Sequence, residues 1–253
     1  MNLYTKNIGK TFSGVNVLRN VNFTLEPGEV HALVGENGAG KSTFVKILSG
    51  VYTPTDGDIF LDNKKIKINT PIAAQKNGVS LIHQEPQSFS HLSVAENIFM
   101  GHMDGNNFSR VKWKDINKSS EKILSSIGLK IDPKNIMEGL SIADQQMIEI
   151  AGALSKNSKI LIMDEPTSPL TPNEVGKLFD IVNQLKAQGM AIIFISHRLE
   201  EIRSIANRVT IFRDGDLITT QKINEITNEE IIKYMIGRSI EDIDVKENDF
   251  LKK

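Results

Sequence analysis

Residues 35–43 read Gly35-Glu36-Asn37-Gly38-Ala39-Gly40-Lys41-Ser42-Thr43. Gly35, Gly40, Lys41 and Ser42 stand at the fixed positions of the phosphate-binding loop pattern. Glycines let the backbone wrap closely around phosphate groups, and successive N–H groups at the start of a helix point at the anion. We therefore expect Lys41 to reach the β and γ phosphates of a nucleotide, and Ser42 to bind Mg²⁺.

The residues on either side of this loop favour a phosphate site over a flexible turn that matches the pattern by chance. Before the loop, residues 30–34 form a short apolar run that is typical of a buried strand. After it, residues 44–48 form an apolar helical stretch. A strand, a glycine-rich turn and a helix in this order are the context in which the pattern indicates phosphate binding.

Two further buried-strand runs end in polar residues. Residues 160–163 are followed by Asp164 and Glu165, and residues 191–195 lead to His197. Ligands bind at the carboxyl ends of parallel strands. We expect Asp164 to hold Mg²⁺ through water, Glu165 to orient and polarise the attacking water, and His197 to hydrogen-bond the γ-phosphate. Taken alone, each strand end would be an ordinary loop, and the phosphate-binding loop is what favours the functional interpretation.

The rest of the chain divides into strand-rich and helix-rich parts. The first third predicts strands and turns, residues 93–154 predict mainly helices, and the last third alternates strand and helix. Within the middle part, residues 112–127 and 141–154 are the clearest helices, and Ser141 stands at the cap position of the second with Asp144 three residues on. Strands alternating with helices imply a parallel sheet covered on both sides.

The composition excludes several kinds of site. The chain has 253 residues, no cysteine and a net charge of −1. Disulfides, thiolate metal sites and cysteine nucleophiles are therefore excluded, and the net charge gives no general reason to bind nucleic acid. The first residues lack the apolar core of a signal peptide, and no window approaches the roughly 18 apolar residues of a spanning helix. If the protein serves a membrane, we expect it to do so through partners.

The order of these motifs resembles the ATPase subunit of ATP-binding cassette (ABC) transporters over residues 1–237. The family signature, usually Leu-Ser-Gly-Gly-Gln, stands here as Leu140-Ser141-Ile142-Ala143-Asp144-Gln145-Gln146. Gln84 matches the glutamine-loop position, Phe12 lies where an aromatic ring stacks on adenine, and residues 168–171 occupy the position of the dimer-contact loop. The resemblance implies that Gln84 supports Mg²⁺ and catalysis, and that Phe12 and Val17 contact the nucleotide.

The signature departs from the family pattern. Ile142 and Ala143 replace its two glycines, and Asp144 replaces its glutamine. Because side chains obstruct the close approach of backbone to a phosphate and an acid repels it, we expect this signature to serve a weakened site. The variant resembles the N-terminal cassettes of bacterial sugar importers, in which two cassettes are fused in one polypeptide. Autoinducer-2 importers share much of this pattern, so the solute stays open.

The resemblance implies an α/β fold with a phosphate-loop NTPase core of the ABC ATPase type, an antiparallel β edge region and an inserted helical subdomain. We expect residues 1–86 and 154–237 to form the RecA-like ATP-binding core with the antiparallel region. Residues 87–153 would form the helical subdomain that carries the signature, and residues 238–253 a polar tail or linker.

The implied reaction is Mg²⁺-dependent hydrolysis of ATP that energises an importer, either for a monosaccharide such as ribose or galactose or for autoinducer-2 or a nucleoside. The implied partners are a second nucleotide-binding cassette, membrane permease subunits that dock near residues 84–99 and, indirectly, a solute-binding protein, with no nucleic acid. The location would be peripheral, at the cytoplasmic face of the cell membrane.

Two rival functions stay open. A non-transport cassette of translation or DNA repair would usually carry basic tails or long coiled-coil insertions, and this chain shows neither. A module that binds ATP without hydrolysing it is the other, and the presence of Glu165 and His197 argues against it.

Overall fold

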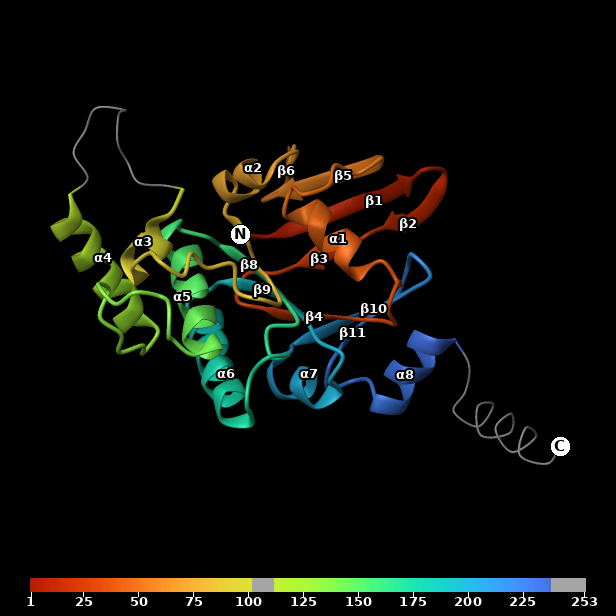
Figure 1. Cartoon of the computed structure of the whole chain (residues 1–253). Coiled ribbons are helices and arrows are strands. Elements are labelled where there is room, and N and C mark those ends of the chain that lie inside the picture. The colour runs from red at the N-terminus through yellow and green to blue at the C-terminus, as the bar shows by residue number, and fades with distance from the viewer. Residues whose placement is uncertain (102–111, 238–253) are drawn as a thin grey trace.

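A run of parallel strands forms the centre of the computed structural model, which describes residues 1–101 and 112–237 (Figure 1). In their order across the sheet these strands are β10 Arg208–Arg213, β4 Val30–Val34, β9 Ala191–Ile195, β8 Ile160–Asp164 and β7 Val79–Ile82. The strands predicted at 30–34, 160–163 and 191–195 are thus confirmed and lie side by side. Because they are parallel, their carboxyl ends meet at one edge of the sheet.

The central strands are buried on both faces. Val30 and Ala32 of β4 pack into one hydrophobic cluster, whereas Leu33 packs into another. The two clusters lie on opposite faces, because successive side chains of a strand point to opposite sides. The apolar residues of α1 Lys41–Leu48 belong to the second cluster, and those of α6 Pro172–Ala187 to the first. Burial on both faces explains why these strands read as continuous apolar runs.

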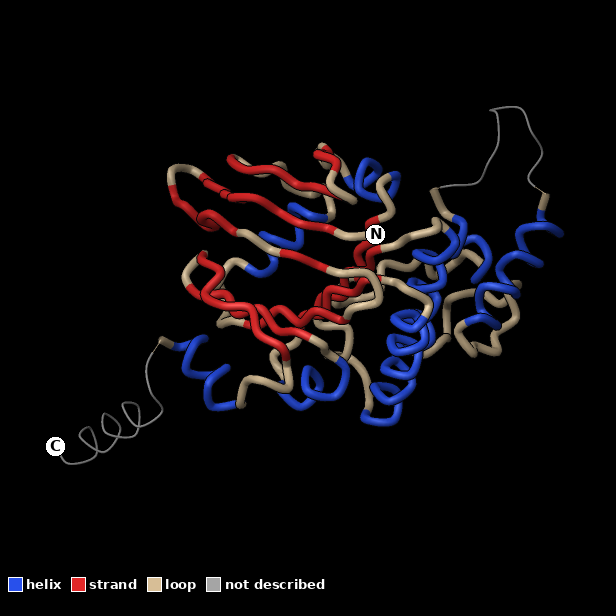
Figure 2. Tube along the Cα trace, turned by 180° about the vertical axis from the view of Figure 1, so that it is seen from behind, coloured by secondary structure: helices blue, strands red, loops and turns tan. Residues whose placement is uncertain are grey.

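The antiparallel part of the sheet lies beyond β10. Its strands are β11 Asp216–Lys222, β2 Val15–Val21, β1 Leu3–Phe12, β3 Thr24–Leu25, β5 Asp56–Leu61 and β6 Lys64–Ile66. β11 pairs antiparallel with β10 and pairs with β2 in parallel at Asp216 and Arg19, whose side chains form an ion pair of 2.6 Å. β1 pairs antiparallel with β2, β3 and β5. In the view from behind, this part of the sheet lies above the central strands (Figure 2). The predicted antiparallel edge region is confirmed.

The helix-rich segment lies between β7 and β8, which pair directly with each other. Its helices are α3 Val94–Phe99, α4 Trp113–Ser126 and α5 Ile142–Ser155. The helices predicted at 112–127 and 141–154 are therefore confirmed to within about one or two residues. Ser141 caps α5, because its Oγ accepts a hydrogen bond from the Asp144 N–H (3.1 Å). The tail expected at 238–253 lies outside the described residues.

The remaining helices are α2 Pro71–Lys76, α7 Leu199–Ile205 and α8 Asn228–Ile236. α6 opens with a capping box, in which the Glu174 carboxylate accepts the N–H of Thr171 (2.8 Å). Across the described part of the chain, no helix combines the length and the apolar character needed to cross a bilayer.

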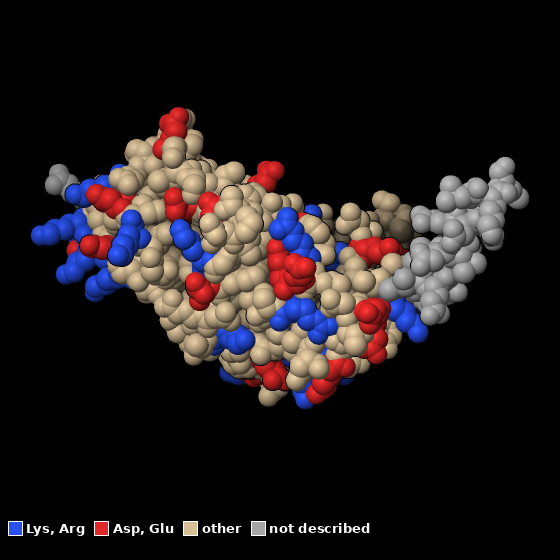
Figure 3. All heavy atoms as spheres, turned by 90° about the horizontal axis from the view of Figure 1, so that it is seen from below, with Lys and Arg blue, Asp and Glu red and all other residues tan. Residues whose placement is uncertain are grey.

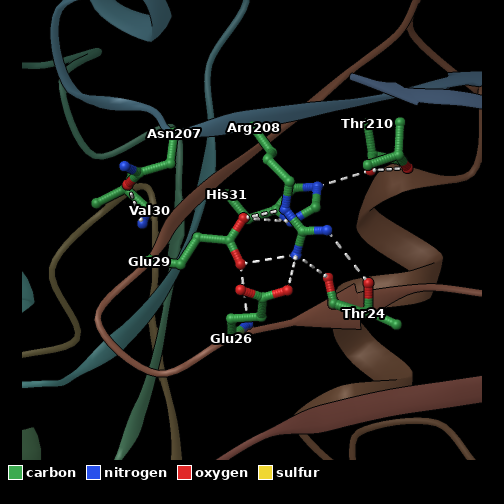
Figure 4. Close-up of polar contacts among 9 residues, drawn as sticks. Thr24, Glu26, Glu29, Val30, His31, Asn207, Arg208 and Thr210 are labelled. Atoms are coloured by element: carbon green, nitrogen blue, oxygen red, sulfur yellow. Dashed lines mark hydrogen bonds and ion pairs between the residues drawn. The ribbon is translucent and has the colours of Figure 1, made fainter. Parts of the chain in front are cut away.

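A polar network joins β4 to β10 at the edge of the sheet opposite the strand carboxyl ends (Figure 4). The Arg208 guanidinium donates to both carboxylate oxygens of Glu29 (2.6 and 2.8 Å). The Glu26 N–H also donates to Oε2 of Glu29 (2.8 Å), and Nδ1 of His31 lies 3.1 Å from Oε1 of Glu29. Burial raises the pKa of Glu29, but the hydrogen bonds from Arg208 and the proximity of His31 outweigh burial and lower the pKa to about 2. The network fixes the entry to β4 against the start of β10.

Candidate active site

The loop of residues 35–40 leaves β4 and turns directly into α1. Gly35 and Gly40 have positive φ angles of 153° and 105°. A Cβ on Gly35 would lie 2.3 Å from the carbonyl oxygen of Phe212, and one on Gly40 would lie 2.6 Å from Cδ2 of Leu18. Both positions therefore require glycine, because the loop backbone lies closely against β10 and β2.

The Lys41 side chain folds over this loop. Its Nζ donates to the carbonyl oxygens of Gly35 (2.7 Å) and Glu36 (3.0 Å). Burial lowers the pKa of Lys41, while the carboxylates of Glu165 and Asp164 act in the opposite direction. The ammonium group thus lies between the loop and these two acids, as expected of a group that holds a polyanionic ligand near a reaction site.

The remaining residues of segment 36–43 differ in their exposure to solvent. Glu36, Asn37, Gly38 and Ser42 are exposed, Thr43 is half-buried and Ala39 is buried. Ser42 stands in the first turn of α1, where backbone N–H groups have no partner within the helix. This is the end of a helix that favours an anion.

Asp164 is the last residue of β8 and is half-buried. Burial and the like charge of Glu165 raise the pKa of Asp164, while the neighbouring His83 and Lys41 act in the opposite direction. The end of β8 therefore faces both the loop after β4 and the segment after β7. The structure brings Asp164 and Lys41 together, although they are far apart in the sequence.

Glu165 turns the chain away from the sheet. Its φ of 47° is left-handed, and its N–H donates to the carbonyl oxygen of Ile195 at the end of β9 (3.0 Å). Its Oε2 lies 3.4 Å from Nδ1 of His197. An acid and an imidazole from neighbouring strand ends thus lie within reach of one position, as general-base chemistry requires.

Gln84 reaches the same edge from the end of β7. Its Nε2 donates to Oγ of Ser168 (3.2 Å), which leaves the amide oxygen of Gln84 as its acceptor group. Ser42, Asp164 and Gln84 together offer a hydroxyl, a carboxylate and an amide oxygen. Mg²⁺ prefers oxygen ligands and is usually bound through one or two carboxylates, water and the phosphates of its nucleotide, so this set of donors fits Mg²⁺.

Phe12 and Val17 belong to the β1–β2 hairpin next to the loop. The Phe12 ring is exposed, meets the Tyr52 ring edge to face (5.1 Å between centroids) and lies 4.9 Å below Nζ of Lys10. The carbonyl oxygen of Val17 would lie only 3.2 Å from a Cβ on Gly40. The exposed Phe12 ring thus lies on the strand next to the one that contacts the loop. Lys10 and Tyr52 flank the ring, and no sequence motif predicts their position.

The signature lies in a different part of the molecule, at the start of α5. Oγ of Ser88 donates to Oε1 of Gln145 (2.9 Å), and Nε2 of Gln145 donates to the Leu140 carbonyl oxygen (3.1 Å). Ile142 is 50% exposed, whereas Ala143 is buried. Ser141 and Asp144 line a groove that runs along α6 from Glu174 to Gln184. Among residues 1–101 and 112–237, the side-chain hydrogen bonds of Ser141 and Gln145 stay within residues 88–145. Helix α5 also lies apart from α1 (Figure 1), so one chain does not bring its signature to its own loop.

Comparison with known proteins gives one consistent result. The sequence profile of a family described as ABC transporter matches residues 18–168, more than half of the chain. The ribose import ATP-binding protein RbsA 2 of Streptomyces avermitilis is 45% identical over 241 residues, which are 95% of this chain and 48% of that protein. The putative ribose/galactose/methyl galactoside import ATP-binding protein 1 of Agrobacterium fabrum is 46% identical over 240 residues, 95% of this chain and 47% of that protein. The chain spans about half the length of the curated relatives it matches.

Solved structures show the same architecture. The ADP conformation of MJ1267, an ATP-binding cassette of an ABC transporter, has a TM-score of 0.82 at 25% identity and covers 94% of this chain and 100% of its own. A nucleotide-free ATP-binding cassette from an ABC transporter has a TM-score of 0.80 at 26% identity, with 94% and 96% covered. The predicted fold is confirmed, and the matched region holds the phosphate-binding loop, Gln84, the signature and the Asp164-Glu165 strand end. This chain belongs to the ABC transporter family.

Proposed function

We propose that this chain binds and hydrolyses Mg-ATP and thereby powers an importer for a monosaccharide such as ribose or galactose. The observation that carries the ATPase part is the meeting of Lys41, Asp164, Glu165 and His197 at one edge of the sheet. The sugar part is supported by the relatives above, which are named as ribose or ribose/galactose import ATP-binding proteins.

The chain's own residues divide the work of hydrolysis. Lys41 and the backbone N–H groups of the loop hold the β and γ phosphates, and Phe12 and Val17 receive the base. Ser42, Asp164 and Gln84 would hold Mg²⁺, which neutralises charge on the phosphate oxygens when it is bound. Glu165 accepts a proton from the attacking water, and His197 positions Glu165 and stabilises charge on the transferring group.

We propose that a second cassette completes the site, because one chain holds its signature away from its own loop. The length of the relatives, about twice that of this chain, is consistent with a second cassette in the same polypeptide. The membrane partners would be permease subunits, to which a solute-binding protein delivers the solute. The cassettes would lie at the cytoplasmic face of the membrane. Residues 87–153 would act as the helical subdomain that moves against the core at residues 1–86 and 154–237.

The proposal is tested with Glu165→Gln in the presence of the second cassette. We expect the variant to keep the parent's ATP affinity in titration calorimetry but to release phosphate at least about a hundredfold more slowly, the scale on which a positioned base acts. Glu200→Gln, an exposed glutamate in the first turn of α7, is the matched control and should behave as the parent. Equal turnover of Glu165→Gln and parent would exclude Glu165 as the base.

The solute is tested separately by uptake. Cells that lack their own ribose and galactose importers should take up labelled ribose or galactose when they express the complete system, and should lose that uptake with Lys41→Ala. Uptake of autoinducer-2 or a nucleoside in place of both sugars would contradict the sugar assignment and leave the ATPase assignment standing.

A further inference from the structure

A wide groove lies beside α4 in the helix-rich part of the molecule, apart from α1 and the phosphate-binding loop before it (Figure 1). Its volume is about 920 Å³, and it runs between α4 and the segment of residues 128–134 that follows the helix. Two lysines line it from each of these sides, namely Lys114, Lys118, Lys130 and Lys134. The acids in its lining are Glu121 and Asp132, so the groove is basic.

The lysines of this groove have no acidic partner. All four are exposed, and within residues 1–101 and 112–237 none of them forms an ion pair within 4.0 Å. Oδ1 of Asp132 instead accepts the backbone N–H of Lys134 (2.9 Å). The four ammonium groups therefore keep their donors for an anion from outside the chain.

The positive charge extends beyond the groove. Residues 112–134 hold six lysines against three acids, whereas the whole chain has a net charge of −1. Figure 3 shows Lys and Arg side chains gathered at the end of the molecule that carries α4. This end attracts anions although the chain as a whole does not. Because an exposed lysine is a mobile point charge without fixed geometry, the surface suits many spread anionic groups better than one precisely held ligand.

An exposed tryptophan stands beside these lysines. Trp113 is the first residue of α4, is 46% exposed and follows Lys112 directly. It begins the apolar stripe of α4, whose later members Ile123 and Leu124 belong to a hydrophobic cluster. Trp113 is in neither cluster. An indole ring among lysines is typical of the boundary between a membrane and water.

The groove borders the segment that the proposed function places at a membrane protein. Its loop continues into residues 133–138, which are joined to residues 90–95 by backbone hydrogen bonds. The Val94 N–H donates to the Asn135 carbonyl oxygen (2.8 Å), and the Ala95 N–H to that of Pro133 (2.9 Å). Residues 90–95 lie within the stretch 84–99 that we expect to meet permease subunits. A surface next to such a contact is close to lipid.

We propose that the groove of Lys114, Lys118, Lys130 and Lys134 binds the anionic phospholipid headgroups of the membrane surface, with Trp113 at the membrane–water boundary. The inference rests on the proposed function, because that function brings the chain to a membrane, but it needs no contact with a permease. A soluble anion fits the groove less well, since the lysines are all exposed and no buried charged side chain fixes a ligand there.

The first test measures binding of the purified chain, without a permease, to lipid vesicles. We expect the chain to sediment with vesicles of phosphatidylcholine and phosphatidylglycerol in equal parts, but not with vesicles of phosphatidylcholine alone. Binding should weaken as the salt rises from about 0.1 M to about 1 M, because the Debye length falls from about 10 Å to about 3 Å. Trp113 is the one tryptophan of the chain, so its emission should shift to shorter wavelengths with the anionic vesicles and become shielded from acrylamide.

The second test removes charge from the groove. The double variant Lys118→Gln with Lys134→Gln should bind anionic vesicles at least about tenfold more weakly, because each lysine near an anionic surface contributes about a fivefold factor. Lys64→Gln with Lys233→Gln is the matched control. It removes the same charge from two exposed lysines of β6 and α8 and should bind as the parent does. Both double variants should keep the parent's circular dichroism and ATP affinity.

Four outcomes would overturn the inference. The parent could fail to bind the anionic vesicles, or bind both kinds of vesicle equally. Lys118→Gln with Lys134→Gln could bind as tightly as the parent. The emission of Trp113 could stay unchanged while the chain is bound. Inorganic phosphate or a single-stranded oligonucleotide could bind at these lysines while vesicles do not, which would assign the groove to a soluble anion.

The two proposals fail separately. If the chain binds no vesicles but releases phosphate from ATP in a manner that depends on Glu165, the lipid surface is excluded and the proposed function stands. If the chain binds anionic vesicles through these lysines but releases no phosphate with a second cassette present, the ATPase assignment is excluded and the lipid surface stands.

Discussion

At the scale of single residues, Lys41 is the position for which the loop pattern makes the most specific prediction. The loop pattern predicts a cation that faces phosphates, and the structure places Nζ on the loop carbonyl groups beside two acids. Hydrogen bonds to charged groups contribute more than neutral ones. Loss of this group should therefore weaken ATP binding rather than folding.

We expect Lys41→Ala to lower the affinity for Mg-ATP by at least about tenfold, because it removes a charge-assisted contact worth about 1.5–3 kcal/mol. Titration calorimetry measures the effect directly. Lys46→Ala is the control, since Lys46 is an exposed lysine on the same helix and should change the affinity far less. An affinity of Lys41→Ala equal to the parent's would argue against the phosphate-binding role.

Glu29 allows a residue-scale prediction about stability. Its pKa is about 2 in the folded protein against an ordinary value of 4.5, so it is a group whose stabilisation is fully present above pH 4.5 and is lost as the pH falls towards 2. The shift corresponds to about 3 kcal/mol. Glu29→Gln should lower the free energy of unfolding by this order at pH 7, because it leaves the Arg208 guanidinium without its carboxylate.

Urea unfolding at pH 7 and near pH 3 checks this prediction. The difference between parent and Glu29→Gln should be large at pH 7 and smaller at the lower pH. Glu26→Gln is the matched control, since that carboxylate is exposed and lies 3.9 Å from the same guanidinium, and exposed ion pairs contribute little. A difference between Glu29→Gln and the parent that does not change with pH would exclude the ionised carboxylate as its cause.

At the scale of elements, apolar runs and caps predicted most of the core, while contacts between distant residues were beyond the sequence. The runs at 30–34, 160–163 and 191–195 are buried on both faces, so burial alone left a readable pattern. The hydrogen bonds from Gln84 to Ser168 and from Ser88 to Gln145 produce no pattern in the sequence. Each of them joins segments that lie more than fifty residues apart, and no local periodicity relates such segments.

The surface proposed for permease docking shows the same limit. Among the apolar residues of 89–99, Val94 and Ile98 are buried in the core, and Leu92 and Phe99 are half-buried. Phe89 alone of this group is 57% exposed. Hydrophobicity marked the whole stretch, but only the packing of α3 on α5 decides which side chain remains for a partner. The element-scale prediction therefore rests on Phe89.

We expect Phe89→Asp to reduce solute uptake by at least about tenfold, the effect of losing an aromatic anchor of about 2 kcal/mol, while hydrolysis without the permease is spared. Uptake into proteoliposomes and phosphate release measure the two effects. Tyr234→Asp on α8 is the control, because Tyr234 is also a partly exposed aromatic residue, on a helix at the other end of the molecule from α3 (Figure 1). Normal uptake with Phe89→Asp would remove Phe89 from the docking surface.

At the scale of the whole molecule, the face seen in Figure 3 has no single charged surface that would drive association of two copies. Lys and Arg gather at the end of the molecule that carries α4, but elsewhere on the face seen in Figure 3 the two signs are interspersed. We therefore expect the proposed pairing of cassettes to depend on the nucleotide and on the surfaces around it. The signature is the surface on which this chain differs from the family pattern.

The last prediction concerns the chain without a second kind of cassette. Ile142 is 50% exposed at the start of α5, and Asp144 stands in the same first turn. If two copies closed on ATP, each phosphate would meet an aliphatic side chain and an acid in place of two glycines and a glutamine. We therefore expect the isolated chain to bind Mg-ATP, to stay largely monomeric and to hydrolyse ATP slowly.

Restoring glycine at Ile142 and Ala143 should increase ATP-dependent self-association when Glu165→Gln blocks turnover, and sedimentation of that triple variant against Glu165→Gln alone measures the change. Because Ala143 is buried and a glycine in a helix costs about 1 kcal/mol, Ile142→Gly with Glu165→Gln is the variant that separates the surface effect from lost helix stability. A tight ATP-bound homodimer of Glu165→Gln with the native signature would contradict the requirement for a second, different cassette.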